Sequence, residues 1–360
     1  MHRSLLPRLL LSLSLLHAVT AAAAIPERFI AEYAQAHDFS GTLLVRQRGQ
    51  PDYRRSFGLA QRAFAAPNAA DTRYKIASIT KLFTAVLVLQ AHEQGRVDLQ
   101  ATIGLYLPDY RGPARDRVSV RQLLNHTSGL TNFDQVKTAE QALREGLPPY
   151  QTPYTSQQLL EKFCSGPLVH VPGANFDYNN GDYVILGKIL ESVYGQSYDR
   201  LLRERILDPL ALRDTGLLRS EALVARLADT YHHLEPGGAL RRDPPVYPEN
   251  WYAAGALYST ADDTLAFAEA LFGGRLLRPE SLALMLAPGL DDYGFGLWTY
   301  TVQHADGPHR IAKRPGAIAG AQAQLYRDLD AGLTVVILAN TDSADLGEFA
   351  AQIGKRAAAP

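Results

Sequence analysis

The sequence predicts an α+β fold in which an antiparallel sheet is assembled from both ends of the chain and flanked by helices. Two β-rich segments, 40–49 and 53–60, occur near the N-terminus, and three more, 293–302, 319–328 and 332–340, occur near the C-terminus. The segments between them show mainly helical spacing. Strands at both chain ends with helices between them are typical of a sheet that the two ends build together, with a largely helical region inserted.

Composition and charge limit the class of protein. The chain has 360 residues, of which 46% are apolar and 20% charged, as in an ordinary globular protein. This length is sufficient for a large core, formed by one domain or by two interleaved ones. The 36 basic and 37 acidic side chains give a formal charge of −1. Nucleic-acid-binding proteins usually show a basic patch or a high isoelectric point, so this balance argues against a nucleic-acid partner.

The first 24 residues have the pattern of an export signal. His2, Arg3 and Arg8 lead into the apolar run LLLSLSLLHAV at 9–19, which is followed by the small residues TAAAA. This pattern predicts a signal peptide over 1–24 and a periplasmic or secreted protein. The apolar run is short for a membrane span, so no stable span is expected after cleavage; an uncleaved anchor is the alternative.

The remaining residues, 25–360, are expected to form a single domain. Its α/β part covers about 25–75 and 290–360, and its helical part covers about 76–289. No internal repeat or low-complexity segment divides this region.

In chain order, the first element is a short helix over 27–37. The two N-terminal strands follow, joined by a turn at 49–51, where glycine and proline favour a change of direction. A long helix begins near Ser78 and ends at Gly95, because glycine is the favoured residue just past a helix end.

Helical spacing recurs in the middle of the chain, at 118–130, 155–163 and 182–195. Thr155 with Gln158, and Thr260 with Asp263, resemble capping boxes that begin helices. Asn180 is a candidate cap for the helix of 182–194. Pro- and Gly-rich connections lie around 145–153, 235–249 and 272–278.

The C-terminal part returns to strands. The segments 319–328 and 332–340 are joined by the turn LDA at 329–331, and a helix from about Ala344 closes the chain.

Cysteine and histidine usage gives no sign of a metal site. Cys164 is the single cysteine, so no intramolecular disulfide can form, and a packed thiol on a helix face is expected. The ten histidines are scattered, and the one adjacent pair, His232–His233, is expected in a solvated loop. No C-x-x-C or H-E-x-x-H pattern occurs, and we predict no metal and no cofactor.

A serine and a lysine lie three residues apart at the start of the apolar helix RYKIASITKLFTAVLVL, residues 73–89. Positions i and i+3 are neighbours on a helix, so the Ser78 hydroxyl is expected beside the Lys81 amine. Burial and the positive end of the helix dipole both lower the pKa of such a lysine. A lysine of this kind can accept a proton from serine, and backbone N–H groups at the helix start can stabilise an oxyanion. Because S-x-x-K alone often occurs by chance, further motifs are needed.

Several ordered segments supply them and resemble the serine β-lactamase-related family. The family includes class C β-lactamases, D-alanyl-D-alanine carboxypeptidases, penicillin-binding-protein-like hydrolases and related esterases. The likeness extends from about residue 39 to 340 and implies a β-lactamase/transpeptidase-like fold. Besides the Ser78 region it rests on VSVRQLLNHTSGL (118–130), PGANFDYNNGDYVILGKILE (172–191), AAGALYSTADDTLAFAEAL (253–271) and YGFGLW (293–298).

The resemblance implies roles for individual residues. Ser78 corresponds to the acylated nucleophile and Lys81 to the neighbouring proton acceptor. Tyr178 and Asn180 match a Y-x-N motif. Tyr178 would pass protons between serine, lysine and leaving group, for which nearby cations must lower its pKa. Asn180 would hold the lysine and the substrate amide.

The last family motif is altered in this chain. The family pattern is K-T-G or H-x-G, whereas the best match here is RPGAIAG, with Arg314, Gly316 and Gly320. Arg314 could hold a substrate carboxylate, but it cannot readily give up a proton. The resemblance makes Ala317 the source of the second oxyanion N–H, and the two glycines fit a strand that substrate approaches closely. Lys313 is the alternative to Arg314 if the register differs by one, and a simple turn is the alternative to a site strand.

His126, in NHTSG, is expected to have no catalytic role, because no G-x-S-x-G elbow or matching acid accompanies it. The aromatic residues Trp251, Tyr252, Tyr258 and Tyr293 could line a cleft or fill the core, and their place is left open.

The resemblance therefore implies an exported serine hydrolase that forms an acyl-enzyme on a peptide, β-lactam or ester carbonyl. The expected partner is a small-molecule or peptide substrate: a peptidoglycan peptide, a β-lactam or an ester. Two alternatives remain: an esterase for small neutral esters, and a cell-wall or β-lactam binding protein that does not turn over. The sequence does not indicate the oligomeric state.

Overall fold

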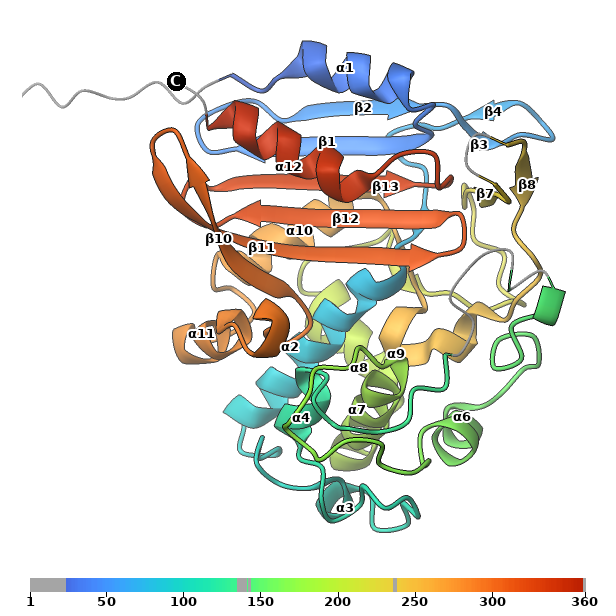
Figure 1. The fold of residues 1–360 in the computed structure, drawn as a ribbon, viewed down its shortest axis with the longest axis vertical. Coiled ribbons are helices and arrows are strands. Elements are labelled where there is room, and N and C mark those ends of the chain that lie inside the picture. Colours follow the sequence, from blue (N-terminus) through green and yellow to red (C-terminus); the bar gives the residue numbers. More distant parts are fainter. Residues whose placement is uncertain (1–23, 135–140, 142–143, 236–237, 359–360) are drawn as a thin grey trace, which may run out of the picture.

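The computed structural model of the protein describes residues 24–134, 141, 144–235 and 238–358. Its largest sheet has six strands in the order β10-β11-β12-β13-β1-β2, all antiparallel. β1 and β13 are direct neighbours, with Gly41 opposite Ala339 and Gln47 opposite Leu333. The predicted α+β class, with a sheet built from both chain ends, is confirmed (Figure 1). The predicted signal peptide, apart from Ala24, lies outside the described residues.

The strands are β1 (Gly41–Gln47), β2 (Tyr53–Phe57), β3 (Leu59–Gln61), β4 (Ala66–Pro67), β5 (Tyr74–Lys75), β6 (Gly216–Leu217), β7 (Tyr231–His233), β8 (Leu240–Arg242), β9 (Leu257–Ser259), β10 (Trp298–His304), β11 (Gly307–Ile318), β12 (Ala321–Asp328) and β13 (Leu333–Ala339). The α-helices are α1 (Glu27–Ala36), α2 (Thr80–Glu93), α3 (Ile103–Tyr106), α4 (Val120–Leu124), α6 (Ser156–Phe163), α7 (Asn180–Tyr194), α8 (Tyr198–Leu202), α9 (Tyr252–Gly255), α10 (Ala261–Phe272), α11 (Pro279–Leu286) and α12 (Leu346–Ala357). Short turns of 3-10 or π helix are η1 (Ala77–Ile79), η2 (Arg203–Leu207), η3 (Pro248–Trp251) and η4 (Leu290–Asp292).

Helices cover both faces of the sheet. In β13 every residue is buried, with Val335 and Ile337 in the cluster that includes α1 and α12, and Val336 and Leu338 in the cluster that includes α2 and α10. Successive strand residues point to opposite faces, so a strand covered on both sides reads as a continuous apolar run. Figure 1 shows α12 across the front of the sheet and α10 behind it.

The helix α2 runs through the centre of the helical part and is buried over most of its length. It is apolar on nearly all sides because other helices surround it. The ring of Phe83 stacks on that of Phe267 in α10, with centroids 3.7 Å apart. A fixed, buried α2 gives the residues at its start, including Lys81, a rigid position. Among the described residues, a helix with the length and hydropathy of a membrane span does not occur.

Two predicted elements differ in extent from the structure. The helix expected over 118–130 is limited to α4, and β10 begins at 298 rather than at 293. The twelve-residue strand β11 was absent from the strands expected from β-propensity. Its glycines and prolines have low β-propensity. Hydrogen-bonded pairing with both β10 and β12 stabilises the extended conformation, which the local sequence does not favour.

The predicted helix starts are partly confirmed. Thr155 and Gln158 form both hydrogen bonds of a capping box. Thr260 accepts from the Asp263 N–H, but the Asp263 carboxylate accepts from Asp214 N–H and Thr215 instead of closing the box. The suggestion that Asn180 caps α7 is wrong, because Asn179 is the capping residue.

Two side-chain expectations can also be compared with the structure. Cys164 is buried, as expected. The expectation of a solvated His232–His233 pair is wrong for His232, which is 2% exposed in β7, with Nδ1 2.8 Å from a carboxylate oxygen of Asp243. Pairing with an acid accounts for its burial.

Candidate active site

Ser78 lies in the 3-10 turn η1, between β5 and α2, at the junction of the sheet and the helical part. It is partly exposed, whereas its neighbours Ala77 and Ile79 are buried. Ala77 has φ of +46°, in the left-handed region that costs energy for a residue with a side chain. As the second residue of the turn, Ser78 has an N–H without a partner inside the turn. The local backbone thus presents both the hydroxyl and the N–H of one residue.

Lys81 lies one turn further on and is completely buried. Its Nζ donates to Asn180 Oδ1 at 2.6 Å and to Ser78 Oγ at 3.2 Å. A third bond goes to the Ala254 carbonyl at 2.9 Å. Burial lowers the pKa of Lys81 to about 8. The ammonium is fully hydrogen-bonded, so the cost of its burial is compensated, yet it is close to losing its proton near neutral pH.

Tyr178 reaches the same hydroxyl from the loop before α7. Its hydroxyl donates to Ser78 Oγ at 2.8 Å. Burial alone would raise the pKa of Tyr178, but the charges of Arg314 and Lys81 outweigh burial, so the pKa lies below its usual value of 10. Ser78 Oγ therefore has two ionisable groups within hydrogen-bond distance, and either group can take its proton once it has lost its own.

Arg314, in β11, is directed at Tyr178. The guanidinium is 1% exposed and donates to the Tyr178 hydroxyl, to the Tyr293 hydroxyl at 2.9 Å and to the Ser78 carbonyl at 2.8 Å. Tyr293, left open from the sequence, is thus a buried partner of this cation. Lys313, the alternative in register, lies beside the ring of Tyr300, 5.1 Å from its centroid, so Arg314 is the residue brought into the site.

Asn180 joins Lys81 to an acid that sequence reasoning missed. The Asn180 Nδ2 donates to Asp134 Oδ2 at 2.6 Å, and the Tyr150 hydroxyl donates to Asp134 Oδ1 at 2.5 Å. Because the Asn180 nitrogen is held by Asp134, its oxygen is fixed toward Lys81. Asp134 belongs to no motif, so no local pattern points to its role.

His126 lies beneath Tyr178 rather than beside Ser78. Its ring centroid is 4.4 Å from that of Tyr178, and its Nδ1 is 2.9 Å from Asp182 Oδ2, with both side chains fully buried. Among the described residues no hydrogen bond joins His126 to Ser78. The His126 carbonyl accepts from Asp177 N–H at 2.9 Å, which anchors the chain just before Tyr178. Sequence reasoning found no acid for His126; Asp182, two residues after Asn180, is that acid.

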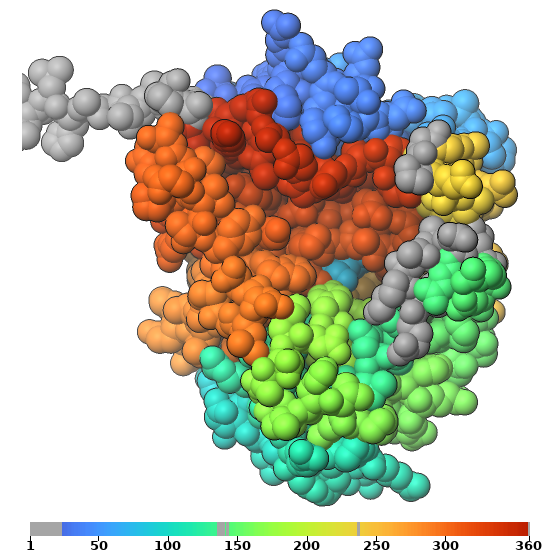
Figure 2. Space-filling view, in the orientation of Figure 1, coloured from blue at the N-terminus to red at the C-terminus, as the bar shows by residue number. Residues whose placement is uncertain are grey.

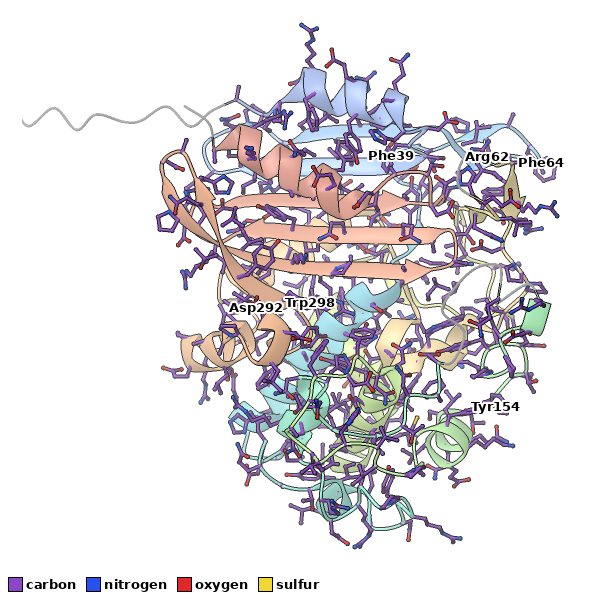
Figure 3. The ribbon with its side chains drawn as sticks, viewed as in Figure 1. Phe39, Arg62, Phe64, Tyr154, Asp292 and Trp298 are labelled. Atoms are coloured by element: carbon purple, nitrogen blue, oxygen red, sulfur yellow. The ribbon has the colours of Figure 1, made fainter. Side chains whose placement is uncertain are left out.

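Gly316 allows β11 to approach η1. A Cβ added at Gly316 would lie 2.6 Å from the Ile76 carbonyl oxygen and 3.0 Å from the Ser78 nitrogen. Pairing between β10 and β11 ends at Trp298 and Lys313, so this edge of β11 from Arg314 onward faces the site, with Ala317 exposed beside it. Figure 3 shows Trp298 at this junction. Gly320 makes a similar close approach to Tyr231, so both glycines accommodate the protein's own backbone.

A pocket of about 610 Å³ adjoins this constellation. Asn180 and Ala317 line it on the side of the reactive groups, and Phe133, Tyr150 and Trp251 are among its apolar residues. Tyr150 and Trp251 stack with centroids 3.7 Å apart. Figure 2 shows the surface hollowed between the sheet and the helical part. Of the aromatic residues left open, Trp251 therefore lines the cleft, while Tyr252 is buried in the core.

Comparison with known proteins places the chain among hydrolases of one family. A family model described as Beta-lactamase matches residues 26–358. The chain is 25% identical over 342 residues to penicillin-binding protein 4* of Bacillus subtilis, covering 86% of this chain and 69% of that protein. It is 28% identical over 273 residues to esterase EstB of Burkholderia gladioli, covering 67% of each. A D-stereospecific amidohydrolase from Streptomyces sp. superimposes with a TM-score of 0.75 at 27% identity, covering 89% of this chain and 96% of that one.

Proposed function

The chain belongs to the β-lactamase family of serine hydrolases, and we propose that it cleaves an amide or ester bond through an acyl-enzyme on Ser78. The single observation that carries the proposal is the approach of two ionisable groups of lowered pKa to one hydroxyl. Tyr178 Oη lies 2.8 Å and Lys81 Nζ 3.2 Å from Ser78 Oγ. Activation of a serine by adjacent bases within this range is what nucleophilic catalysis requires.

In the proposed reaction Ser78 Oγ attacks the substrate carbonyl while its proton passes to the Tyr178–Lys81 pair. The carbonyl oxygen becomes an oxyanion, which the N–H groups of Ser78 and Ala317 stabilise. The pair then returns the proton to the leaving nitrogen or oxygen, leaving the acyl group on Ser78. Water attacks this ester by the reverse route and releases the acid.

Arg314 acts in this proposal on Tyr178 rather than on a substrate carboxylate. Its guanidinium is buried and donates to Tyr178, Tyr293 and Ser78. A fixed cation beside a phenol favours the phenolate, which is the form that accepts a proton. The expected grip on a substrate carboxylate is therefore not part of the mechanism.

The proposed substrate carries a bulky apolar group and no obligatory carboxylate. The pocket beside Asn180 and Ala317 is lined largely by apolar and aromatic side chains. Asp134 adds a carboxylate next to Asn180, which disfavours a negative charge at that point of the substrate. Aromatic amides and esters fit these features better than β-lactams. The names of the relatives, an esterase and an amidohydrolase among them, agree with this choice.

Intact-mass spectrometry tests the acyl-enzyme. Incubation with a fluorophosphonate should add one phosphonyl group to the wild-type chain and none to Ser78→Ala, while circular dichroism shows both folded. Turnover of a nitrophenyl ester and an aromatic amide should be lost in Ser78→Ala. Full activity of Ser78→Ala rules out the assignment.

A substrate panel separates the remaining alternatives. Nitrocefin, a D-Ala-D-Ala peptide, a nitrophenyl ester and an aromatic amide distinguish β-lactamase, carboxypeptidase, esterase and amidase activities. A stable adduct on Ser78 with no product from any of the four identifies a binding protein instead. Benzylpenicillin serves as a second mass label for that outcome.

We also propose export, on the basis of the pattern in 1–24. In a bacterial host the mature protein should appear in the periplasm or medium with a mass that lacks those residues. A full-length mass in the cytosol contradicts export.

A further inference from the structure

A second cluster of polar side chains lies at the far end of β11 from the reactive serine. His304 ends β10, His309 is near the start of β11, and Asp328 ends β12. One nitrogen from each histidine and one carboxylate oxygen lie within 4.8 Å of one another. His309 precedes Arg314 by five residues, about 17 Å along a strand, so the cluster is separate from the Ser78 site.

These three side chains are buried, which is unusual for groups of this kind. Asp328 is fully buried, and His304 and His309 are each 8% exposed. The imidazole centroids are 4.7 Å apart and the rings are tilted by 58°, so they converge without stacking flat. Buried polar side chains normally have hydrogen-bond partners.

His304 breaks this rule. Its Nε2 is buried and has no hydrogen-bond partner among the described residues. Leaving a buried polar atom unpaired costs about 1 to 3 kcal/mol. Because His304 belongs to the cluster with His309 and Asp328, a bound ligand in this cluster would explain its unpaired nitrogen. A metal ion accepts a lone pair from an imidazole nitrogen and would remove this cost.

Asp328 is already oriented as a ligand. Its Oδ1 accepts the N–H groups of Asp330 and Ala331, at 3.1 and 2.8 Å, and its Oδ2 lies 2.6 Å from His309 Nδ1. Hydrogen bonds that fix one carboxylate oxygen leave the other directed toward the cluster, as outer partners do in metal sites. Asp306, in the β10–β11 turn, adds an oxygen 3.2 Å from His309 Nε2.

We propose that His304, His309 and Asp328 form a structural zinc site that joins the β10–β11 hairpin to β12. Two imidazoles and one carboxylate suit Zn²⁺, whereas Mg²⁺ and Ca²⁺ prefer oxygen ligands alone. Water supplies the fourth ligand of a tetrahedron. Asp306 accepts from the other ring nitrogen of His309, Nε2, which leaves Nδ1 for the metal. Zinc distances of about 2.0 to 2.2 Å place ligand atoms about 3.4 Å apart, so His309 Nδ1 and Asp328 Oδ2, which lie 2.6 Å apart without the metal, separate slightly on binding.

Without a metal, the alternative is an ion pair of protonated His309 with Asp306 and Asp328. Burial lowers the pKa of His309, but the bonds to the two carboxylates outweigh it and raise the pKa above its usual value. A proton and a metal ion compete for this imidazole, so the experiment is done at about pH 8, where the proton competes less. The ion pair leaves His304 without a role, and this residue therefore discriminates between the two arrangements.

The test is zinc binding by the full chain after removal of metal with a chelator. Titration against a chromophoric zinc indicator should show one Zn²⁺ per chain, and saturation should raise the melting temperature. His304→Ala should weaken binding at least tenfold and abolish the rise. Because the His304 side chain makes no hydrogen bond in the described residues, this variant removes a ligand without breaking a bond.

His37→Ala is the matched control, since His37 is an exposed histidine on α1's end, distant in sequence from the hairpin. It should bind zinc as the wild type does. Equal binding by His304→Ala and wild type, or no binding by either at micromolar zinc, overturns the proposal. Fluorophosphonate labelling of Ser78 should be the same in both variants, so the two proposals can fail independently.

Discussion

Arg314 stands at the position of the cation in the family motif, but its hydrogen-bond partners are groups of the protein itself rather than a substrate carboxylate. The resemblance predicts a cation at this position, and the chain has one, but its donors meet Tyr178, Tyr293 and the Ser78 carbonyl. A guanidinium carries its charge at all relevant pH values, so it exerts a constant field on the phenol. At the residue scale, this field and that of Lys81 decide the protonation of the site.

The first prediction concerns pH. For activity the Tyr178–Lys81 pair must lack one proton, so kcat/KM should fall as pH decreases below about 8, the pKa of Lys81. Arg314 lowers the pKa of both groups. In Arg314→Gln both values rise, and the acid limb should move to higher pH by about one pH unit or more. A pH profile of kcat/KM on a nitrophenyl ester measures the move.

Arg314→Lys is the control for this prediction, because it keeps the charge and loses only the planar fork. Its acid limb should lie closer to that of the wild type than the limb of Arg314→Gln. Identical limbs in all three proteins would show that Arg314 does not act on the titrating pair.

At the scale of elements, the site depends on how closely β11 approaches η1. A Cβ added at Gly316 would lie too close to the Ile76 carbonyl oxygen and to the Ser78 nitrogen, so only glycine allows this approach without a shift of the backbone. β10 stops pairing at Lys313, which leaves this part of β11 free to meet η1. The part of β11 that carries Arg314 and Ala317 can therefore lie against η1 for two reasons. Gly316 has no side chain, and β10 does not pair with this part of the strand.

The second prediction is that Gly316→Ala separates these elements. The added Cβ would be 2.6 Å from the Ile76 oxygen, so β11 or η1 must shift by a few tenths of an ångström or more. Displacement of this order at a reacting centre should lower kcat by about 100-fold. Steady-state kinetics gives the loss. In the control Gly166→Ala the new Cβ meets atoms no nearer than 3.6 Å, and activity should be retained. Equal activity of the two variants would falsify the role given to the close approach.

At the scale of the whole molecule, helices from the two chain ends pack on one face of the large sheet, and the candidate site lies away from that face. α1 and α12 cover one face of the sheet, while Ser78 and the pocket lie toward the helical part. Phe349 of α12 is fully buried and stacks on Tyr33 of α1, with centroids 4.1 Å apart. Contacts between the ends therefore determine stability, and contacts at the junction determine chemistry.

The third prediction follows from that separation. Phe349→Ala should lower the free energy of unfolding by about 3 to 5 kcal/mol, because it leaves a cavity between α12, α1 and the sheet. The folded fraction should keep its kcat/KM. Denaturant unfolding and active-site titration measure the two quantities. Phe64→Ala, which changes a ring 78% exposed (Figure 3), should alter stability by less than about 0.5 kcal/mol. A loss of kcat/KM in folded Phe349→Ala contradicts the separation.

Features that depend on near neighbours and on periodicity could be predicted from the order of the amino acids alone. The spacing of Ser78 and Lys81 brings them together because positions i and i+3 share one face of a helical turn. Segments rich in residues of high β-propensity indicated the strands near both chain ends, and with them the α+β class. The Thr155 cap also follows from a local pattern, and the structure confirms it.

The orientation of groups that lie far apart in sequence depends on packing of the whole chain. Tyr178 and Arg314 reach Ser78 from 100 and 236 residues away, and Asp134 and Asp182 carry no local signal of their partners. The sign of the Tyr178 pKa change depends on burial against two cations, and that balance exists only when the packed chain sets their distances. The local sequence specifies which groups are present, whereas packing specifies which partners each group contacts. The reason is that electrostatic and hydrogen-bond energies depend on distance and direction, not on order along the chain.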